Sequence, residues 1–174
     1  MKKNQGFTLV EMIIVIAIAG ILAGSSVMAL NSLKYANAKK CANEIDSMID
    51  KARVLSMTKG PTNLFIYWYK DGYYMKYQKE DVLVKSTGGT FLCNDEITIT
   101  AYSNETPVSF KKVNTLASIK IAFKRSNGAL LPDDSMNFET FDNTPRIYNK
   151  IVVSSENGEY TIRIVELTGK HYIE

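Results

Sequence analysis

The segment from Phe7 to Leu30 constrains the fold of this chain more than any other feature. It holds 24 residues and a single ionisable side chain, Glu11. As an α-helix it would rise about 36 Å, enough to cross a hydrocarbon core of about 30 Å. Lys2 and Lys3 precede it without an acidic residue, which predicts a cytoplasmic N-terminus and an exported remainder. We therefore expect a membrane-spanning helix at residues 7–30.

This apolar segment differs from that of a secretory signal peptide. A signal peptide has an apolar stretch of roughly 7–15 residues, and a small-residue cleavage site follows that stretch. Here the apolar run is longer, and Gly6 comes before it. An unpaired carboxylate inside a membrane helix is costly, so Glu11 predicts a polar partner. The alternative is that Glu11 reaches the lipid headgroups.

The stretch GFTLVE at residues 6–11, followed by the apolar run, resembles the class III (prepilin) signal of type IV pilins and pseudopilins. The resemblance implies that a prepilin peptidase cleaves between Gly6 and Phe7 and that Phe7 is then N-methylated. Residues 1–6 would be the leader. The resemblance also implies a structural subunit of a type IV pilus or a type II secretion-like filament. Its partners would be other pilin or pseudopilin subunits, the cytoplasmic membrane and an assembly platform.

In such a filament Glu11 has a chemically suitable partner. A carboxylate in hydrocarbon is stabilised by a cation, and the free amine of Phe7 in a neighbouring subunit can supply one. The pair would relieve the desolvation of both groups and fix the register between subunits. We therefore predict that Glu11 acts in subunit assembly.

The helix is predicted to continue beyond the apolar run. Apolar residues recur at alternating steps of four and three, which is typical of a one-sided helix, at Cys41, Ile45, Met48, Ala52 and Leu55. Gly60 and Pro61 then predict its end. Residues 31–60 are thus an amphipathic continuation, and residues 7–59 would form one rod of about 80 Å. Its lower half would span the membrane or contact other copies, and its upper half would pack on a globular head.

After Pro61 the pattern changes to that of strands. Alternating or aromatic-rich runs bounded by turn residues occur at 63–69, 73–78, 82–85, 96–101, 119–123, 150–154 and 160–166. The turn residues 70–72 between the first two runs and Asn157-Gly158 between the last two predict two hairpins. The fold class is therefore α+β, with a long helix laid on an antiparallel sheet and a β-rich extracytoplasmic head at residues 61–174. The order of elements loosely resembles the H-type minor pseudopilins.

The composition argues against an enzyme. The formal net charge of +3 gives no strong global field, and the single histidine, His171, lies near the C-terminus. Neither a histidine-bound zinc ion nor a Ser-His-Asp triad is expected, and no cofactor or metal is predicted. The acidic residues Asp133, Asp134 and Asp142 lack calcium-loop spacing and are expected in a solvated loop.

Two features leave alternatives open. Cys41 and Cys93 would form a disulfide if the helix packs on the strand near Cys93, or they are buried free thiols. The alternative function is a competence-type subunit that binds DNA through Lys111-Lys112 and Lys124-Arg125. A membrane-tethered enzyme or receptor would differ from both, because Gly6 and Glu11 would then be dispensable.

Overall fold

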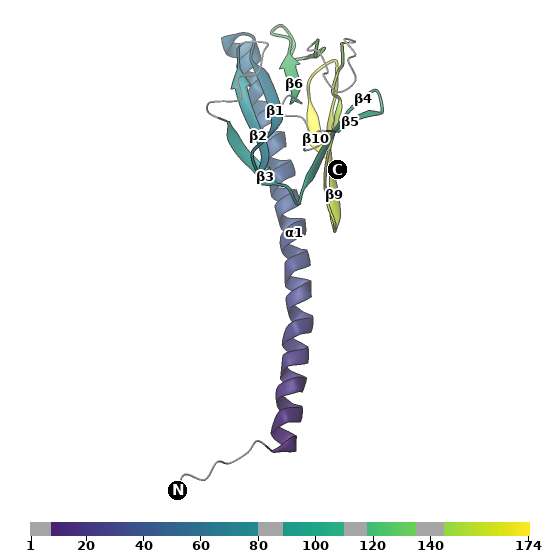
Figure 1. Cartoon of the computed structure of the whole chain (residues 1–174). Coiled ribbons are helices and arrows are strands. Elements are labelled where there is room, and N and C mark those ends of the chain that lie inside the picture. The colour runs from purple at the N-terminus through teal and green to yellow at the C-terminus, as the bar shows by residue number, and fades with distance from the viewer. Residues whose placement is uncertain (1–7, 80–88, 110–117, 135–144) are drawn as a thin grey trace.

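The molecule combines one long helix with a β-rich head (Figure 1). The computed structural model describes residues 8–79, 89–109, 118–134 and 145–174, and for residues 25–31 and 109 it describes the backbone only. In Figure 1 the helix enters the head at one end and extends far below it at the other. The predicted α+β class is confirmed.

Helix α1 runs from Leu9 to Lys59 and has 51 residues, which corresponds to about 76 Å. Thr8 is its N-cap. Gly60 ends it with φ 105° and ψ 180°, a conformation that is open essentially to glycine alone. Pro61 follows and cannot donate a helical hydrogen bond. The predicted single rod and its end at Gly60 are therefore confirmed.

Among the described residues, ten strands form two five-stranded antiparallel sheets. The first sheet has the order β3-β2-β1-β6-β7 and consists of β1 (Asn63–Tyr69), β2 (Gly72–Gln78), β3 (Thr90–Asn94), β6 (Ser118–Phe123) and β7 (Leu130–Leu131). The second has the order β10-β9-β8-β4-β5 and consists of β4 (Thr98–Ser103), β5 (Thr106–Ser109), β8 (Lys150–Ser155), β9 (Gly158–Ile164) and β10 (His171–Ile173).

The chain changes sheets after β3, between β5 and β6, and again between β7 and β8. The sequence did not predict this division, because strand alternation does not say which strands share a sheet. The strands β3, β5 and β7 were not predicted, and the predicted strand at 82–85 lies outside the described residues. The two predicted hairpins, β1–β2 and β8–β9, are confirmed.

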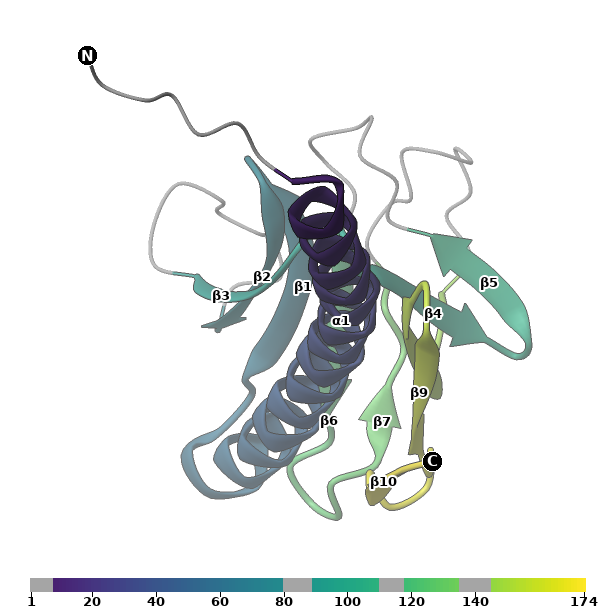
Figure 2. The same cartoon turned by 90° about the horizontal axis from the view of Figure 1, so that it is seen from below.

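The upper part of α1 packs between the two sheets, as the view along the helix shows (Figure 2). One apolar cluster joins the helix to strands of both sheets; it includes Leu64, Ile66 and Met75 of the first sheet and Ile99, Ile151 and Ile162 of the second. Full burial of one such side chain stabilises the fold by about 1.5–3 kcal/mol. The helix is therefore part of the core of the head.

The buried stripe of the helix differs in detail from the predicted one. The residues of α1 with no more than 1% exposure are Ala38, Cys41, Ala42, Ile45, Ile49, Ala52 and Ser56. Met48 and Leu55, which were predicted to be core residues, lie at its edges and are half-buried. Three alanines and a serine occupy the centre instead, because small side chains let the helix backbone approach two sheets at once.

Candidate functional site

The start of α1 is a reciprocal hydrogen-bonded cap. The backbone N–H of Glu11 donates to Thr8 Oγ1 at 3.3 Å, and the backbone N–H of Thr8 donates to Glu11 Oε2, also at 3.3 Å. This is a capping box, which satisfies two backbone donors that a helix start leaves without a partner. Within one chain, Glu11 therefore already has a local role that the sequence analysis missed. The Thr-x-x-Glu spacing was the signal that would have revealed it.

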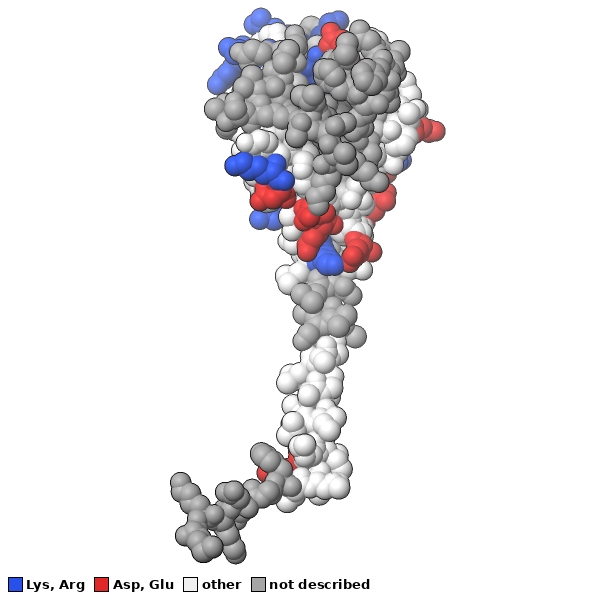
Figure 3. Space-filling view, in the orientation of Figure 1, with Lys and Arg blue, Asp and Glu red and all other residues white. Residues whose placement is uncertain are grey.

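The helix segment above this cap is apolar on all sides and exposed. We call Leu9–Gly24 the lower stalk. Leu9 is 76% exposed, Ile16 68% and Ile21 73%, and Glu11 is the single ionisable residue of the segment. In Figure 3 its atoms are white apart from carboxylate atoms near its base, whereas charged side chains gather on the head. Continuous apolar surface of this kind marks a contact with lipid or protein.

Two glycines of the lower stalk leave room for a close neighbour. A Cβ atom added at Gly20 or Gly24 would meet nothing within 4 Å. Small residues four apart on a helix allow another helix to approach closely. No contact among the described residues therefore explains these glycines.

Within the part of the chain that the structure describes, no helix is long and apolar enough to cross a membrane. The membrane-spanning role of residues 7–30 stays a prediction.

The first 27 residues carry a motif of known class. They match the family model described as the prokaryotic N-terminal methylation motif. The chain has a type IV pilin-type N-terminus. This motif is the class III signal typical of type IV pilins and pseudopilins, which confirms the predicted resemblance. The family is structural and not enzymatic, and the signal implies processing by prepilin peptidase and assembly with other pilins.

Comparison with curated proteins and with solved structures gave no match to the chain.

Three residues of the N-terminal motif were predicted to be functional, Gly6, Phe7 and Glu11, and the structure describes only Glu11. Gly6 and Phe7 lie outside the described residues, so their predicted roles in cleavage and methylation stay predictions. Glu11 is described and exposed. It belongs to the first turn of α1, and Figure 1 shows that this end of the helix lies far from the head.

A second group of residues forms polar and aromatic contacts between the helix and the head, at the point where the helix enters it. The Lys34 ammonium forms an ion pair with the Glu156 carboxylate of the β8–β9 turn. This contact raises the pKa of Lys34 and lowers the pKa of Glu156, chiefly through their hydrogen bond. One residue further on, the Tyr35 ring lies 5.5 Å from the Tyr160 ring, centroid to centroid. The sequence analysis missed these contacts, because the partners are more than 120 residues apart.

Gly158 explains why the β8–β9 turn can lie so close to the helix. A Cβ atom added at Gly158 would lie 2.7 Å from a carbon of the Tyr35 ring. A side chain at this position would therefore push the turn away from the helix. The Asn-Gly pair was predicted only as a hairpin turn, and its contact with Tyr35 adds a packing requirement.

The two cysteines lie together inside the head. Cys41 on α1 and Cys93 on β3 are both buried, and their Sγ atoms are 2.8 Å apart. The hydrogen bond between the thiols, together with burial, raises the pKa of Cys93 well above its ordinary value. The structure therefore contains two thiols in contact.

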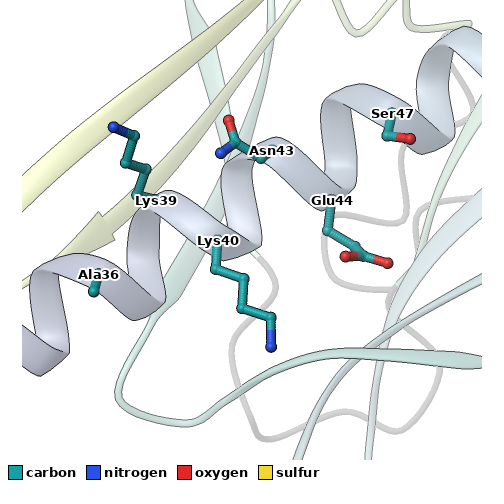
Figure 4. A pocket seen from close by; sticks show the side chains of 6 residues that line it. All are labelled: Ala36, Lys39, Lys40, Asn43, Glu44 and Ser47. Carbon is teal, nitrogen blue, oxygen red and sulfur yellow. The ribbon is translucent and has the colours of Figure 1, made fainter.

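The opposite face of the upper helix is polar. A pocket on this face is lined by Ala36, Lys39, Lys40, Asn43, Glu44 and Ser47 (Figure 4). The lining residues come from one helix face and carry charges of both signs, which is typical of a solvated surface. The predicted solvated face is thereby confirmed.

The acidic cluster is not the solvated loop that was expected. Asp133 is only 3% exposed, and its Oδ2 accepts a hydrogen bond from the backbone N–H of Lys120 at 3.1 Å. Lys120, itself 4% exposed, donates to Asp134 at 2.6 Å, which lowers the pKa of Asp134. Asp142 lies outside the described residues. The prediction of a solvated loop was wrong for Asp133, because a buried lysine on β6 needs a carboxylate nearby.

The remaining candidates for chemistry do not converge on a site. Within the described ranges, no group of three His, Cys, Asp or Glu side chains could hold a metal. His171 Nε2 lies 3.4 Å from Asp46 Oδ1, a contact between β10 and α1. Lys124 and Arg125 are exposed, whereas Lys111 and Lys112 lie outside the described residues. The predicted DNA-binding patch stays a prediction.

Proposed function

We propose that this chain is a pilin-like subunit that a prepilin peptidase processes and that assembles into a filament through its N-terminal helix. The observation that supports this most is the methylation motif at residues 1–27. It stands at the start of a continuous 51-residue helix whose lower stalk is apolar apart from Glu11 and exposes its large apolar side chains by more than half. Other copies or related subunits would cover this surface.

In this proposal cleavage falls between Gly6 and Phe7, and the new N-terminal amine of Phe7 is methylated. The amine of one subunit then pairs with Glu11 of a neighbour. The position of Glu11 supports this step, because its carboxylate is exposed and, among the described residues, is held by the weak local cap at 3.3 Å. A stronger charge-assisted pair can replace such a contact when the helices pack together.

We assign each segment of the chain a separate role in the precursor. Residues 1–6 are a leader, residues 7–30 anchor the precursor in the cytoplasmic membrane, and residues 31–60 connect this anchor to the extracytoplasmic head at residues 61–174. We favour a minor pilin or pseudopilin, because many major pilins close a loop near the C-terminus with their cysteines and this chain does not. The burial of α1 from Ala38 onward supports the border between anchor and head.

The processing step is tested by the N-terminal sequence and mass of the protein from cells with and without a prepilin peptidase. Wild type and Gly6→Ala are compared. We expect a chain that begins at an N-methylated Phe7 only when both the peptidase and Gly6 are present. Retention of residues 1–6 in every case would overturn the proposal and reopen the tethered enzyme or receptor.

A further inference from the structure

The structure assigns a covalent modification to the head: we infer that Cys41 and Cys93 form an intramolecular disulfide in the exported protein. Their Sγ atoms are 2.8 Å apart, although 52 positions separate them along the chain. Cys41 is 1% exposed and Cys93 5%. This bond would form whether or not the chain assembles into a filament.

Two separately ordered elements bring the sulfur atoms together. Cys41 belongs to the buried stripe of α1, next to Ala42, which is fully buried. Cys93 lies on β3, where its backbone is paired with Tyr73 of β2. The helix and the strand therefore both hold their cysteine in place, and no rearrangement of the backbone is needed to bring the thiols into contact.

The surroundings of the pair do not fit a reactive or metal-binding thiol. A nucleophilic cysteine is exposed in part and has a lowered pKa, whereas both thiols here are buried and the pKa of Cys93 is raised. No described carboxylate or histidine joins them to form a metal-binding group of three. Since the chain has only two cysteines, each has one partner within the molecule.

The reaction is thiol–disulfide exchange with an external disulfide. The thiolate of one cysteine attacks that disulfide, forms a mixed disulfide and releases one thiol of the oxidant. The second cysteine then attacks the mixed disulfide, so that the Cys41–Cys93 bond forms and the second thiol leaves. The two cysteines lose two protons and two electrons, and the oxidant gains both. Because the thiols are buried in the finished head, we expect the exchange while the head is folding.

The bond would strengthen the place where the helix leaves the head. Cys41 is near the lower end of the buried stripe, which begins at Ala38. On the opposite side, the Tyr35–Tyr160 contact holds the helix to the second sheet without a covalent bond. A disulfide to β3 would attach the helix to the first sheet, so that a force along the stalk could not detach that sheet. It would also restrict the unfolded chain by closing a long loop.

The test refolds the full-length protein from denaturant into mild detergent in a buffer of oxidised and reduced glutathione, so that exchange can take place before the thiols are buried. Equilibrium is approached both from fully reduced and from fully oxidised protein, and free thiols are alkylated after denaturation and counted by mass spectrometry. The inference predicts one product from both directions, a monomer that takes up no alkylating agent until it is reduced. Two free thiols, or glutathione bound to either cysteine as the main product, would overturn it.

A thermal measurement separates a covalent bond from mere proximity. Adding reductant should lower the melting temperature of the oxidised wild type by roughly 4–16 °C. The same reductant should leave Cys41→Ala and Cys93→Ala unchanged, because each lacks one partner. Both variants keep a small side chain in the core, which limits damage to packing. An unchanged melting temperature of the wild type would contradict the inference.

Discussion

The two ends of helix α1 differ in what surrounds them, although both belong to one continuous helix. Ile16 in the lower stalk is 68% exposed, whereas Ile45 in the upper helix is fully buried between two sheets. The upper helix is one-sided and finds its partner in its own chain. The lower stalk is apolar apart from Glu11, and its large apolar side chains are more than half exposed. We therefore infer that the lower stalk contacts lipid or other chains.

The largest effect that we expect is a difference in unfolding free energy between substitutions of Ile45 and Ile16. Ile45→Ala should destabilise the head by roughly 2–5 kcal/mol, because it leaves a cavity in the core. Ile16→Ala should change the unfolding free energy by less than about 0.5 kcal/mol, since its side chain touches nothing in the head. Denaturant unfolding of the full-length chains in detergent measures both. Equal losses would show that the two parts of the helix do not differ as described.

The next effect concerns assembly through Glu11. Glu11→Gln should reduce the sheared filament fraction at least about tenfold, because it removes one charge of a pair in an apolar setting, a loss of several kcal/mol. The variant keeps the capping box, since glutamine also serves at this position. Quantitative immunoblotting of the filament fraction checks the result.

Thr8→Ala is the matched control for Glu11→Gln. It removes the cap, which costs about 1 kcal/mol at the helix start, but keeps the charge. Its filament fraction should remain within about twofold of wild type. If Thr8→Ala loses assembly while Glu11→Gln keeps it, Glu11 acts through the cap of its own helix and not through a neighbour.

The smallest effect concerns the ion pair between Lys34 and Glu156. The lowered pKa of Glu156 means that its contribution is present above its ordinary value of 4.5 and is lost as the pH falls through the lowered value. The raised pKa of Lys34 means that its contribution is present below 10.5 and is lost as the pH rises through the raised value.

Glu156→Gln should therefore lower the melting temperature slightly between pH 5 and 10, and the difference from wild type should vanish in strong acid. Because both groups are exposed, added salt should reduce the difference. Melting curves across this pH range test the sign. A difference that grows below pH 4 would contradict the assignment of the pair.

Local patterns in the sequence were sufficient for the helix and its change of character. The apolar run, the stripe around Ile45 and the stop at Gly60 each depend on neighbouring residues. The structure confirms the helix, its end and the burial of Ile45, whereas Met48 and Leu55 lie at the edges of the stripe. The sequence left open whether Cys41 and Cys93 form a disulfide or are buried free thiols, because their meeting depends on which strand packs on the helix. The division into two sheets and the Lys34–Glu156 pair could not be predicted, since they join residues far apart in the chain.

In the proposed filament, the lower stalk packs against other subunits. A photo-cross-linking amino acid placed at position 16 tests it most directly, with position 167 on the head as the control, where Leu167 is 80% exposed. In cells that contain the peptidase, we predict that position 16 cross-links to pilin-type subunits and that Gly6→Ala abolishes these products. Absence of protein cross-links from position 16, or the same products with and without processing, would contradict the account.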